Sequence, residues 1–299
     1  MKRNLMFLPR LLVARRRAIA IMKADPPAVV VSVGGYASLP AVLAARRLRI
    51  PVVVVTYDRT PGRSSRVTAR FAAAVATAFP GSDLPRAHFT GAPVRRSVRT
   101  VDRGIGREAA RRELGIPVDR FVISVIGGSL GSKVLNDAVD SFVGQSLDDE
   151  ALAVFHVVGE RFVTEPRTPE SGERGMWYDF TGYEERMAAV YAASDMLIAR
   201  GGAGTIADVA TTGIPAILVP WSAAADDHQT ANVRWLSDHG AAVLVAEERL
   251  PGGLIDAIGE LRADPDALRR MSQRAHELGA PNRGMAIAAL IDDVAGWSA

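Results

Sequence analysis

Residues 200–208 read RGGAGTIAD and place three glycines between an apolar run and a helical pattern. Residues 195–199 are typical of a short buried strand, and apolar residues recur at helical spacing from Ile206 in a helix that we expect to begin at Thr205. Glycine lets backbone N–H groups approach an anion closely, and the first turn of a helix has unpaired N–H donors. The sequence therefore predicts a diphosphate-binding turn, with a plain glycine turn capped by Thr205 as the alternative.

The composition is typical of an ordinary folded enzyme. The chain has 299 residues, of which 48% are hydrophobic, and this is enough apolar material for two cores. It has no cysteine, which excludes disulfides, thiolate metal sites and cysteine nucleophiles. We find no run of about 18 apolar residues that could span a bilayer. The net charge of +3 is too small to predict nucleic acid as a partner.

Basic residues crowd the first segment, residues 2–23, where they are interleaved with leucine and other apolar residues. A basic helix with apolar residues can lie on a surface of anionic lipid. A surface helix with solvated arginines is the alternative, and spacing alone leaves both open. The basic residues concerned are Lys2, Arg3, Arg10, Arg15, Arg16, Arg17 and Lys23.

Apolar runs and helical patterns alternate along the chain, as in parallel βαβ units. We expect strands at residues 28–33, 51–55, 88–90, 121–126, 153–158, 214–219 and 242–245, and helices at residues 39–47, 66–78, 133–142 and 283–297. This pattern predicts two α/β domains of similar fold. They are residues 1–97, completed by a helix within 283–299, and residues 119–282, with a linker at 98–118.

A second glycine turn, GGSLG at residues 127–131, follows the expected strand at 121–126. Ligands of open α/β sheets bind outside the carboxyl ends of the strands. The two glycine turns could therefore converge on one anionic ligand. Asp226, Asp227 and His228 could hold a metal, but a solvated loop is the better interpretation, and His156 fits a buried core position.

Five motifs together resemble the MurG family of bacterial glycosyltransferases in order and approximate spacing. They are GGYASLPAVLAA at 34–45, FTGAPVR at 89–95, GGSLG at 127–131, RGGAGTIAD at 200–208 and DHQTANV at 227–233. The resemblance implies a GT-B architecture, in which two Rossmann-like domains face a cleft. It also implies inverting transfer of N-acetylglucosamine from UDP-GlcNAc to the C4 hydroxyl of MurNAc in undecaprenyl-pyrophosphoryl-MurNAc-pentapeptide. The expected setting is the anionic inner leaflet, at the cytoplasmic face of the cell membrane.

The resemblance also assigns the donor site, with UDP-GlcNAc as substrate and no metal or other cofactor required. Arg95 and Ser129 are expected at the diphosphate, Asp208 at the ribose and Gln229 at the sugar, while the main chain of Glu184 is expected at the uracil. Departure of UDP develops negative charge on the diphosphate, which oriented N–H groups and Arg95 can stabilise. The full expected donor set is Arg95, Gly128, Ser129, Glu184, Ala203, Gly204, Thr205, Ile206, Ala207, Asp208, Gln229 and Asn232.

The acceptor side departs from the family pattern. Gly35, Tyr36, Ser38 and Arg59 are expected there, but Arg59 replaces a sugar-contacting asparagine, and Asp58 is only a weak candidate for the catalytic base. The family's first glycine-rich loop has no counterpart, so we expect the first domain to be incomplete. We favour a family member whose start lies upstream of Met1 or which is a fragment. A related GT-B enzyme with another lipid or metabolite acceptor, and a protein that binds UDP-sugar without turnover, are the alternatives.

Overall fold

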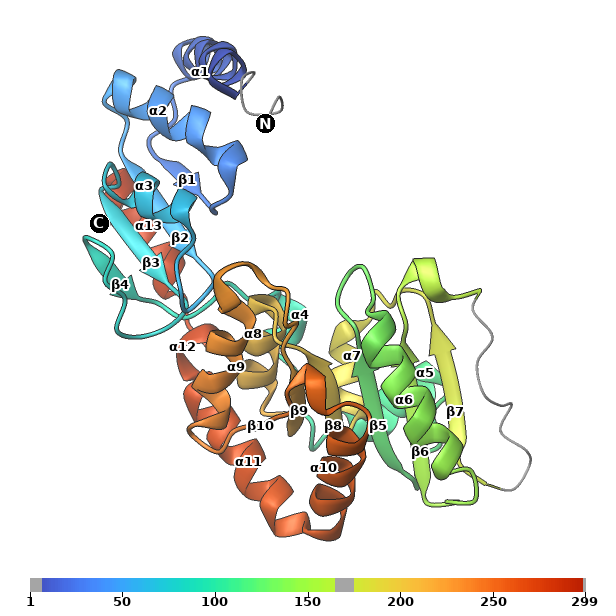
Figure 1. Ribbon diagram of the computed structural model, residues 1–299. Coiled ribbons are helices and arrows are strands. Elements are labelled where there is room, and N and C mark those ends of the chain that lie inside the picture. The colour runs from blue at the N-terminus through green and yellow to red at the C-terminus, as the bar shows by residue number, and fades with distance from the viewer. Residues whose placement is uncertain (1–6, 165–174, 298–299) are drawn as a thin grey trace. The chain divides into compact units, whose positions relative to one another are not determined.

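The computed structural model describes residues 7–164 and 175–297, which form two compact units of parallel α/β structure (Figure 1). Unit 1 contains the described residues up to Pro93 together with those from Gly284 on, and unit 2 contains those from Val94 to Arg283. The predicted fold class, two α/β domains with parallel sheets, is confirmed. Lys2 and Arg3 of the basic segment lie outside the described residues.

Unit 1 is built on a four-stranded parallel sheet in the order β1-β2-β3-β4. The strands are β1 (Val30–Ser32), β2 (Val52–Thr56), β3 (Ala74–Thr77) and β4 (Ala87–Phe89). Helix α1 (Phe7–Ala24) packs on α2 (Leu39–Leu48), a short 3₁₀ turn η1 (Tyr36–Ser38) precedes α2, and α13 (Ala286–Ala295) packs on β2 and β3. The last helix therefore belongs to the first sheet.

The helix expected at residues 66–78 is wrong. Helix α3 (Arg63–Ala69) ends early, and β3 occupies the second part of that stretch. Alanine favours helix locally, but β3 is buried along its whole length and pairs with β2 on one side and β4 on the other. Tertiary pairing overrides the local preference, because small residues fit a strand that is covered on both faces.

Unit 2 is built on a six-stranded parallel sheet in the order β10-β9-β8-β5-β6-β7. Its strands are β5 (Phe121–Ile126), β6 (Leu152–Val157), β7 (Trp177–Thr181), β8 (Met196–Arg200), β9 (Ala216–Val219) and β10 (Val243–Leu244). The sequence analysis did not predict β7. The chain proceeds outward from β5 in one direction and then returns to place β8 on its other side. The crevice outside the carboxyl ends of β5 and β8 is thus the topological switch point.

Helices cover both faces of the unit 2 sheet (Figure 1). Alternate residues of β5 and β8 pack with α6 and α10 in one core cluster, and α8 packs with α4, α9, α11 and α12. The helices are α4 (Arg96–Arg99), α5 (Arg107–Leu114), α6 (Lys133–Gln145), α7 (Met187–Ala193), α8 (Ala203–Thr212), α9 (His228–Ser237), α10 (Gly252–Ala263), α11 (Pro265–Leu278) and α12 (Ala280–Arg283). Short 3₁₀ turns are η2 (Glu160–Phe162), η3 (Ala225–Asp227) and η4 (Glu247–Arg249).

The stretch expected as a linker, residues 98–118, is largely structured. It contains α5, which packs on α7 within unit 2. Arg111 on α5 is 2% exposed and donates to Asp195 at the start of β8. In the part of the chain that the structure describes, no helix is both long and apolar enough to cross a membrane.

Candidate functional site

The glycine turn after β8 forms an open helix start. Helix α8 begins at Ala203 with Gly202 as its N-cap, rather than at Thr205 as predicted, so Thr205 is not the cap. No side chain caps this helix. The first-turn N–H groups of Ala203, Gly204 and Thr205 therefore have no partner within the helix and carry the positive end of its dipole. Ile206 and Ala207 are buried, so a ligand could meet them only through the main chain.

Helix α9 packs directly against this turn. A Cβ atom on Gly201 would lie 2.6 Å from Cγ2 of Val233 and 2.9 Å from the carbonyl oxygen of Gln229. Only glycine fits at that position, because the obstructing atoms include main chain. The side chain of Asn232 donates to the Gly201 carbonyl at 3.4 Å. The structure thus brings Gln229 and Asn232 beside the turn of α8.

The second turn, between β5 and α6, also needs glycine. Gly128 and Gly131 have φ of 87° and 68°, and a Cβ on Gly131 would clash with the Val158 carbonyl. Ser129 at the tip of the turn is exposed. The turn ends at Ser132, whose side chain caps α6 by accepting from Leu135 N at 3.3 Å.

Arg200, the last residue of β8, joins the two turns. It is 7% exposed, and its Nε donates to Oγ of Ser132 at 3.1 Å. Its Nη2 donates to Oε1 of Glu247 at 2.6 Å, and the other oxygen of Glu247 accepts from Ser222 N at 2.9 Å. Sequence reasoning included Arg200 in a motif but gave it no role. Its partners come from other elements, so only the charge at the end of an apolar strand could have pointed to it.

Asp208 and Arg95 act on each other electrostatically. Burial raises the pKa of Asp208 to about 6, against the lowering effects of a hydrogen bond from Tyr191 and of the charge on Arg95. The hydroxyl of Tyr191 donates to Oδ2 of Asp208 at 2.9 Å. Arg95 is the N-cap residue of α4 and is exposed. An exposed cation and a half-buried carboxylate thus lie near the helix start, and sequence reasoning missed Tyr191.

Glu184 and Gln229 use their side chains within the protein. Both oxygens of the Glu184 carboxylate accept from Arg186, at 2.8–2.9 Å, and these bonds lower the pKa of Glu184 despite its burial. A uracil contact at this position would therefore come from the main chain, as expected by resemblance. Oε1 of Gln229 accepts from Trp221 N at 3.0 Å, which orients the amide.

The residues expected on the acceptor side lie at the carboxyl ends of β1 and β2 in unit 1. Gly35 has φ of 75°, and its carbonyl accepts from Ser38 Oγ at 2.9 Å and from Ser64 Oγ at 2.7 Å. Tyr36 is 65% exposed. Asp58 and Arg59 follow β2, with Asp58 half-buried and Arg59 exposed. The two strands are neighbours in the sheet, so these residues share one edge.

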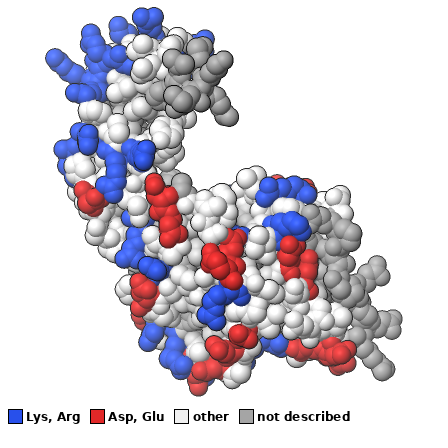
Figure 2. All heavy atoms as spheres, viewed as in Figure 1, with Lys and Arg blue, Asp and Glu red and all other residues white. Residues whose placement is uncertain are grey.

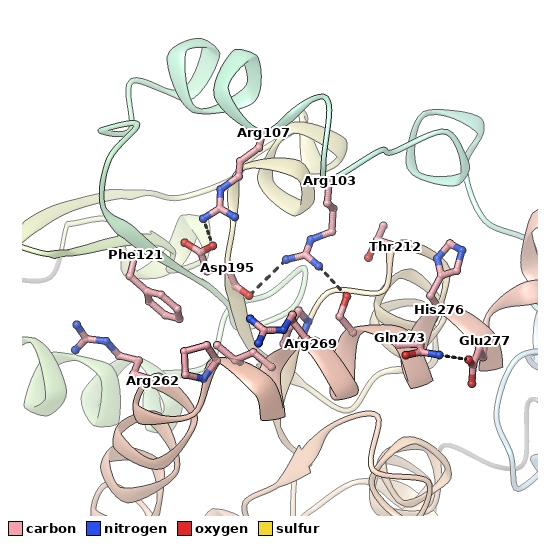
Figure 3. Close-up of a pocket in the computed structure, with 14 residues that line it drawn as sticks. Arg103, Arg107, Phe121, Asp195, Thr212, Arg262, Arg269, Gln273, His276 and Glu277 are labelled. Atoms are coloured by element: carbon pink, nitrogen blue, oxygen red, sulfur yellow. Dashed lines mark hydrogen bonds and ion pairs between the residues drawn. The ribbon is translucent and has the colours of Figure 1, made fainter.

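A cavity of about 740 Å³ lies at the opposite edge of the unit 2 sheet, where β5, β8 and β9 begin (Figure 3). Its arginines have partners within the protein. Arg107 pairs with Asp195, Arg262 with Asp149 at 2.7 Å, and Arg103 donates to four protein oxygens. The cavity is therefore held together by its own charges, and it contains none of the predicted site residues.

The acidic residues considered for a metal, for which a solvated loop is the preferred interpretation, and the core histidine lie in different settings. Asp226 and Asp227 are exposed in η3 and adopt left-handed φ, and no described group of three such side chains gathers closely enough for a metal. His156 is buried in β6 between Tyr178 and Asn136, with ring nitrogens 3.2 and 3.1 Å from their polar atoms. It is a core residue, as the sequence predicts.

Comparisons with known proteins cover both units. The glycosyltransferase family 28 C-terminal domain matches residues 122–283, and the corresponding N-terminal domain matches residues 1–77. A Clavibacter sepedonicus protein is 39% identical over 280 residues, covering 93% of this chain and 73% of the relative. That relative is named UDP-N-acetylglucosamine--N-acetylmuramyl-(pentapeptide) pyrophosphoryl-undecaprenol N-acetylglucosamine transferase, as is a Cutibacterium acnes protein that is 37% identical, covering 88% of this chain and 72% of that relative. The crystal structure of Acinetobacter baumannii MurG aligns with a TM-score of 0.73 and 26% identity, covering 95% of this chain and 78% of that one.

Proposed function

The chain belongs to glycosyltransferase family 28, and on this premise we propose that it transfers N-acetylglucosamine from UDP-N-acetylglucosamine to N-acetylmuramyl-(pentapeptide) pyrophosphoryl-undecaprenol. It is a glycosyltransferase of peptidoglycan synthesis with a GT-B fold. Unit 2 binds the donor and unit 1 the acceptor in this proposal. The alternative is a related GT-B enzyme that acts on another lipid or metabolite acceptor.

The observation that carries the donor assignment is the uncapped start of α8 at the switch point of the sheet. A diphosphate bound there would accept from the N–H groups of Ala203, Gly204 and Thr205. The acceptor hydroxyl attacks the anomeric carbon as the bond to the diphosphate oxygen breaks. The leaving UDP gains negative charge in that step, and the helix start together with Arg95 would stabilise the charge as it develops.

Calorimetric titration with UDP-GlcNAc tests the donor assignment directly. We expect binding that is selective over UDP-glucose and ADP-glucose. A folded chain that binds none of the three would refute the assignment. Transfer of labelled N-acetylglucosamine to the lipid-linked acceptor, compared with other lipid acceptors, then tests the acceptor.

The catalytic base is a separate proposal. Asp58 follows β2 at the edge that also carries Gly35, and a carboxylate there could accept the proton of the attacking hydroxyl. Asp58→Asn is expected to lower kcat by about 10²-fold or more, with little change in the affinity for UDP-GlcNAc. Unchanged kcat would remove Asp58 from this role.

We further propose that α1 attaches unit 1 to an anionic membrane surface. Leu8, Leu12 and Ile21 are 66%, 53% and 69% exposed, although they are apolar. Arg16 and Arg17 are also exposed on this helix, and Figure 2 shows basic side chains gathered over the α1 end of unit 1. Apolar side chains that enter the headgroup region beside arginines that meet lipid phosphates fit an interfacial helix.

Vesicle sedimentation tests the membrane proposal. The chain should bind vesicles containing phosphatidylglycerol, should bind pure phosphatidylcholine vesicles more weakly, and should dissociate at high salt. The double substitution Arg16→Glu and Arg17→Glu should abolish binding. The double substitution Arg269→Glu and Arg270→Glu, at exposed positions on α11 of unit 2, makes the same change of charge and should not abolish binding. Vesicle binding that changes neither with salt nor with the Arg16→Glu and Arg17→Glu double substitution would contradict an electrostatic attachment.

A further inference from the structure

Asp208 has one oxygen that is fixed and one that is not. Oδ2 accepts from the Tyr191 hydroxyl at 2.9 Å, and no described residue donates a hydrogen bond to Oδ1. The side chain is half-buried. Rotation of the carboxyl group would break the bond to Tyr191 and leave a desolvated oxygen without a hydrogen-bond partner. In a helix the side chain leans toward the preceding turn, which here contains Gly204 and Thr205. The oxygen without a partner therefore belongs to a side chain that leans toward the open start of α8.

Tyr191 is well suited to fix that carboxylate. It lies on α7, is 2% exposed, and is held by the core around its ring. Its burial, and then the charge of Asp208, raise its pKa well above 10. The hydroxyl thus stays protonated at neutral pH and acts as a donor to Asp208. A buried tyrosine needs such a polar partner, and Asp208 supplies it.

We propose that Tyr191 is a positioning residue of the donor site, which holds Oδ2 of Asp208 so that Oδ1 accepts a hydrogen bond from a ribose hydroxyl of the nucleoside diphosphate sugar. This inference rests on the proposed donor site. Tyr191 does not itself touch the ligand. It acts through Asp208 alone, and that restriction makes the role separable from a general contribution to folding.

The charged groups around Asp208 determine how its pKa responds to a substitution nearby. Asp208 is the one ionisable residue of α8, and Arg95 is the cation that lowers its pKa. Arg283 on α12 donates to the Thr211 carbonyl, near the other end of α8. The further ionisable groups on the elements packed against α8 are Arg96 and Arg99 on α4, His228 and Arg234 on α9, and Asp266, Arg269, Arg270, Arg274, His276 and Glu277 on α11. The hydrogen bond from Tyr191 lowers the pKa of Asp208. Removing the Tyr191 hydroxyl should therefore raise that pKa further above about 6.

The test is Tyr191→Phe, which keeps the ring and removes only the hydroxyl. UDP is the probe, titrated by calorimetry from acidic to alkaline pH. We expect the variant to bind UDP roughly 3–10-fold more weakly at neutral pH. The pH at which affinity is half lost on acidification should also move upward. In the Asp208→Ala background, Tyr191→Phe should have no further effect on UDP affinity.

Tyr178→Phe is the matched control, because it too removes the hydroxyl of a buried tyrosine, one that contacts His156 in the core. It should leave the UDP affinity and its pH midpoint unchanged. If the wild type binds UDP but Tyr191→Phe shifts neither quantity, the positioning role is overturned while the donor site stands. If the effect persists without Asp208, Tyr191 acts by another route and the inference is wrong. If the wild type does not bind UDP, the donor site and this inference fall together.

Discussion

Unit 2 has arginines at both edges of its sheet, and their partners differ between the edges. At the amino edge, Arg111 donates to Asp195 and to three main-chain carbonyls, and Arg103 donates to four protein oxygens. Arg95, near the carboxyl edge, is exposed, and none of the described residues forms a hydrogen bond or ion pair with its guanidinium. The arginines at the amino edge join α5, α11 and the strands, whereas in the proposed donor site the guanidinium of Arg95 is expected to bind the diphosphate.

The largest expected effect lies at the amino edge. Oδ2 of Asp195 accepts from Arg111 Nη2 at 2.8 Å and from Val122 N at 2.7 Å. Asp195→Ala would leave the guanidinium of Arg111 buried without its carboxylate, and the free energy of unfolding should fall by about 3–5 kcal/mol. Urea-induced unfolding measures this change. Glu108→Ala, which removes an exposed pair with Arg112, should cost less than about 0.5 kcal/mol. Equal effects of the two substitutions would break the comparison.

Arg95→Ala should lower the rate of transfer and leave the stability of the fold unchanged. The guanidinium is expected to act most strongly when the diphosphate gains charge, so kcat should fall by about 10²–10³-fold. The affinity for UDP-GlcNAc should change much less, and the urea midpoint should not move. Steady-state kinetics and calorimetry on the same preparation separate these quantities. Arg112→Ala is the control at an exposed arginine of the other edge. A loss of affinity with unchanged kcat would assign Arg95 to ground-state binding instead.

Asp208→Asn should expose a conflict between stability and donor binding. The pKa of Asp208 is about 6 in the folded protein against 3.8 as the reference value, so the folded state binds this proton more tightly. The protonated carboxyl group of Asp208 therefore stabilises the folded state. This effect is complete below about pH 3.8 and is lost as pH rises through 6. Asparagine carries no charge, so the variant should be more stable at pH 8 by up to about 3 kcal/mol, and not at pH 4. Thermal unfolding at both pH values measures this difference, and a gain at pH 4 alone would give the wrong sign.

The parts of this site that depend on local chain geometry could be predicted from the sequence. The β8–α8 turn follows from an apolar strand, three glycines and a helical pattern in immediate succession. The contacts of Arg200 could not be predicted, because Ser132 lies 68 residues away and Glu247 lies 47 residues away in the other direction. Nothing in the local sequence around Tyr191 points to Asp208, which lies 17 residues further along the chain. Only the folded structure reveals that the Tyr191 hydroxyl, on α7, donates to Asp208 on α8.

The difference between local and long-range determinants also explains why the helix predicted at residues 66–78 of unit 1 is wrong. An alanine-rich stretch at residues 71–78 has no period that separates a helix from a strand buried on both faces. What determines β3 is its pairing with β2 and β4, and those partners are set by the fold as a whole. The strands flanked by clear turns, such as β5, were predicted with their observed bounds.

The smallest expected effect is that of Gln229→Ala, which tests the carboxyl edge of the unit 2 sheet against the amino edge. Oε1 of Gln229 is held by Trp221 N, and no described residue accepts from its Nε2, so this group can donate to a sugar hydroxyl. The variant should bind UDP-GlcNAc roughly 3–10-fold more weakly and bind UDP unchanged, because UDP lacks the sugar. Gln273→Ala removes a glutamine at the amino edge that donates to Glu277, and it should leave both affinities unchanged. If Gln229→Ala weakened UDP and UDP-GlcNAc equally, Gln229 would act by supporting the glycine turn through α9 rather than by contacting the sugar.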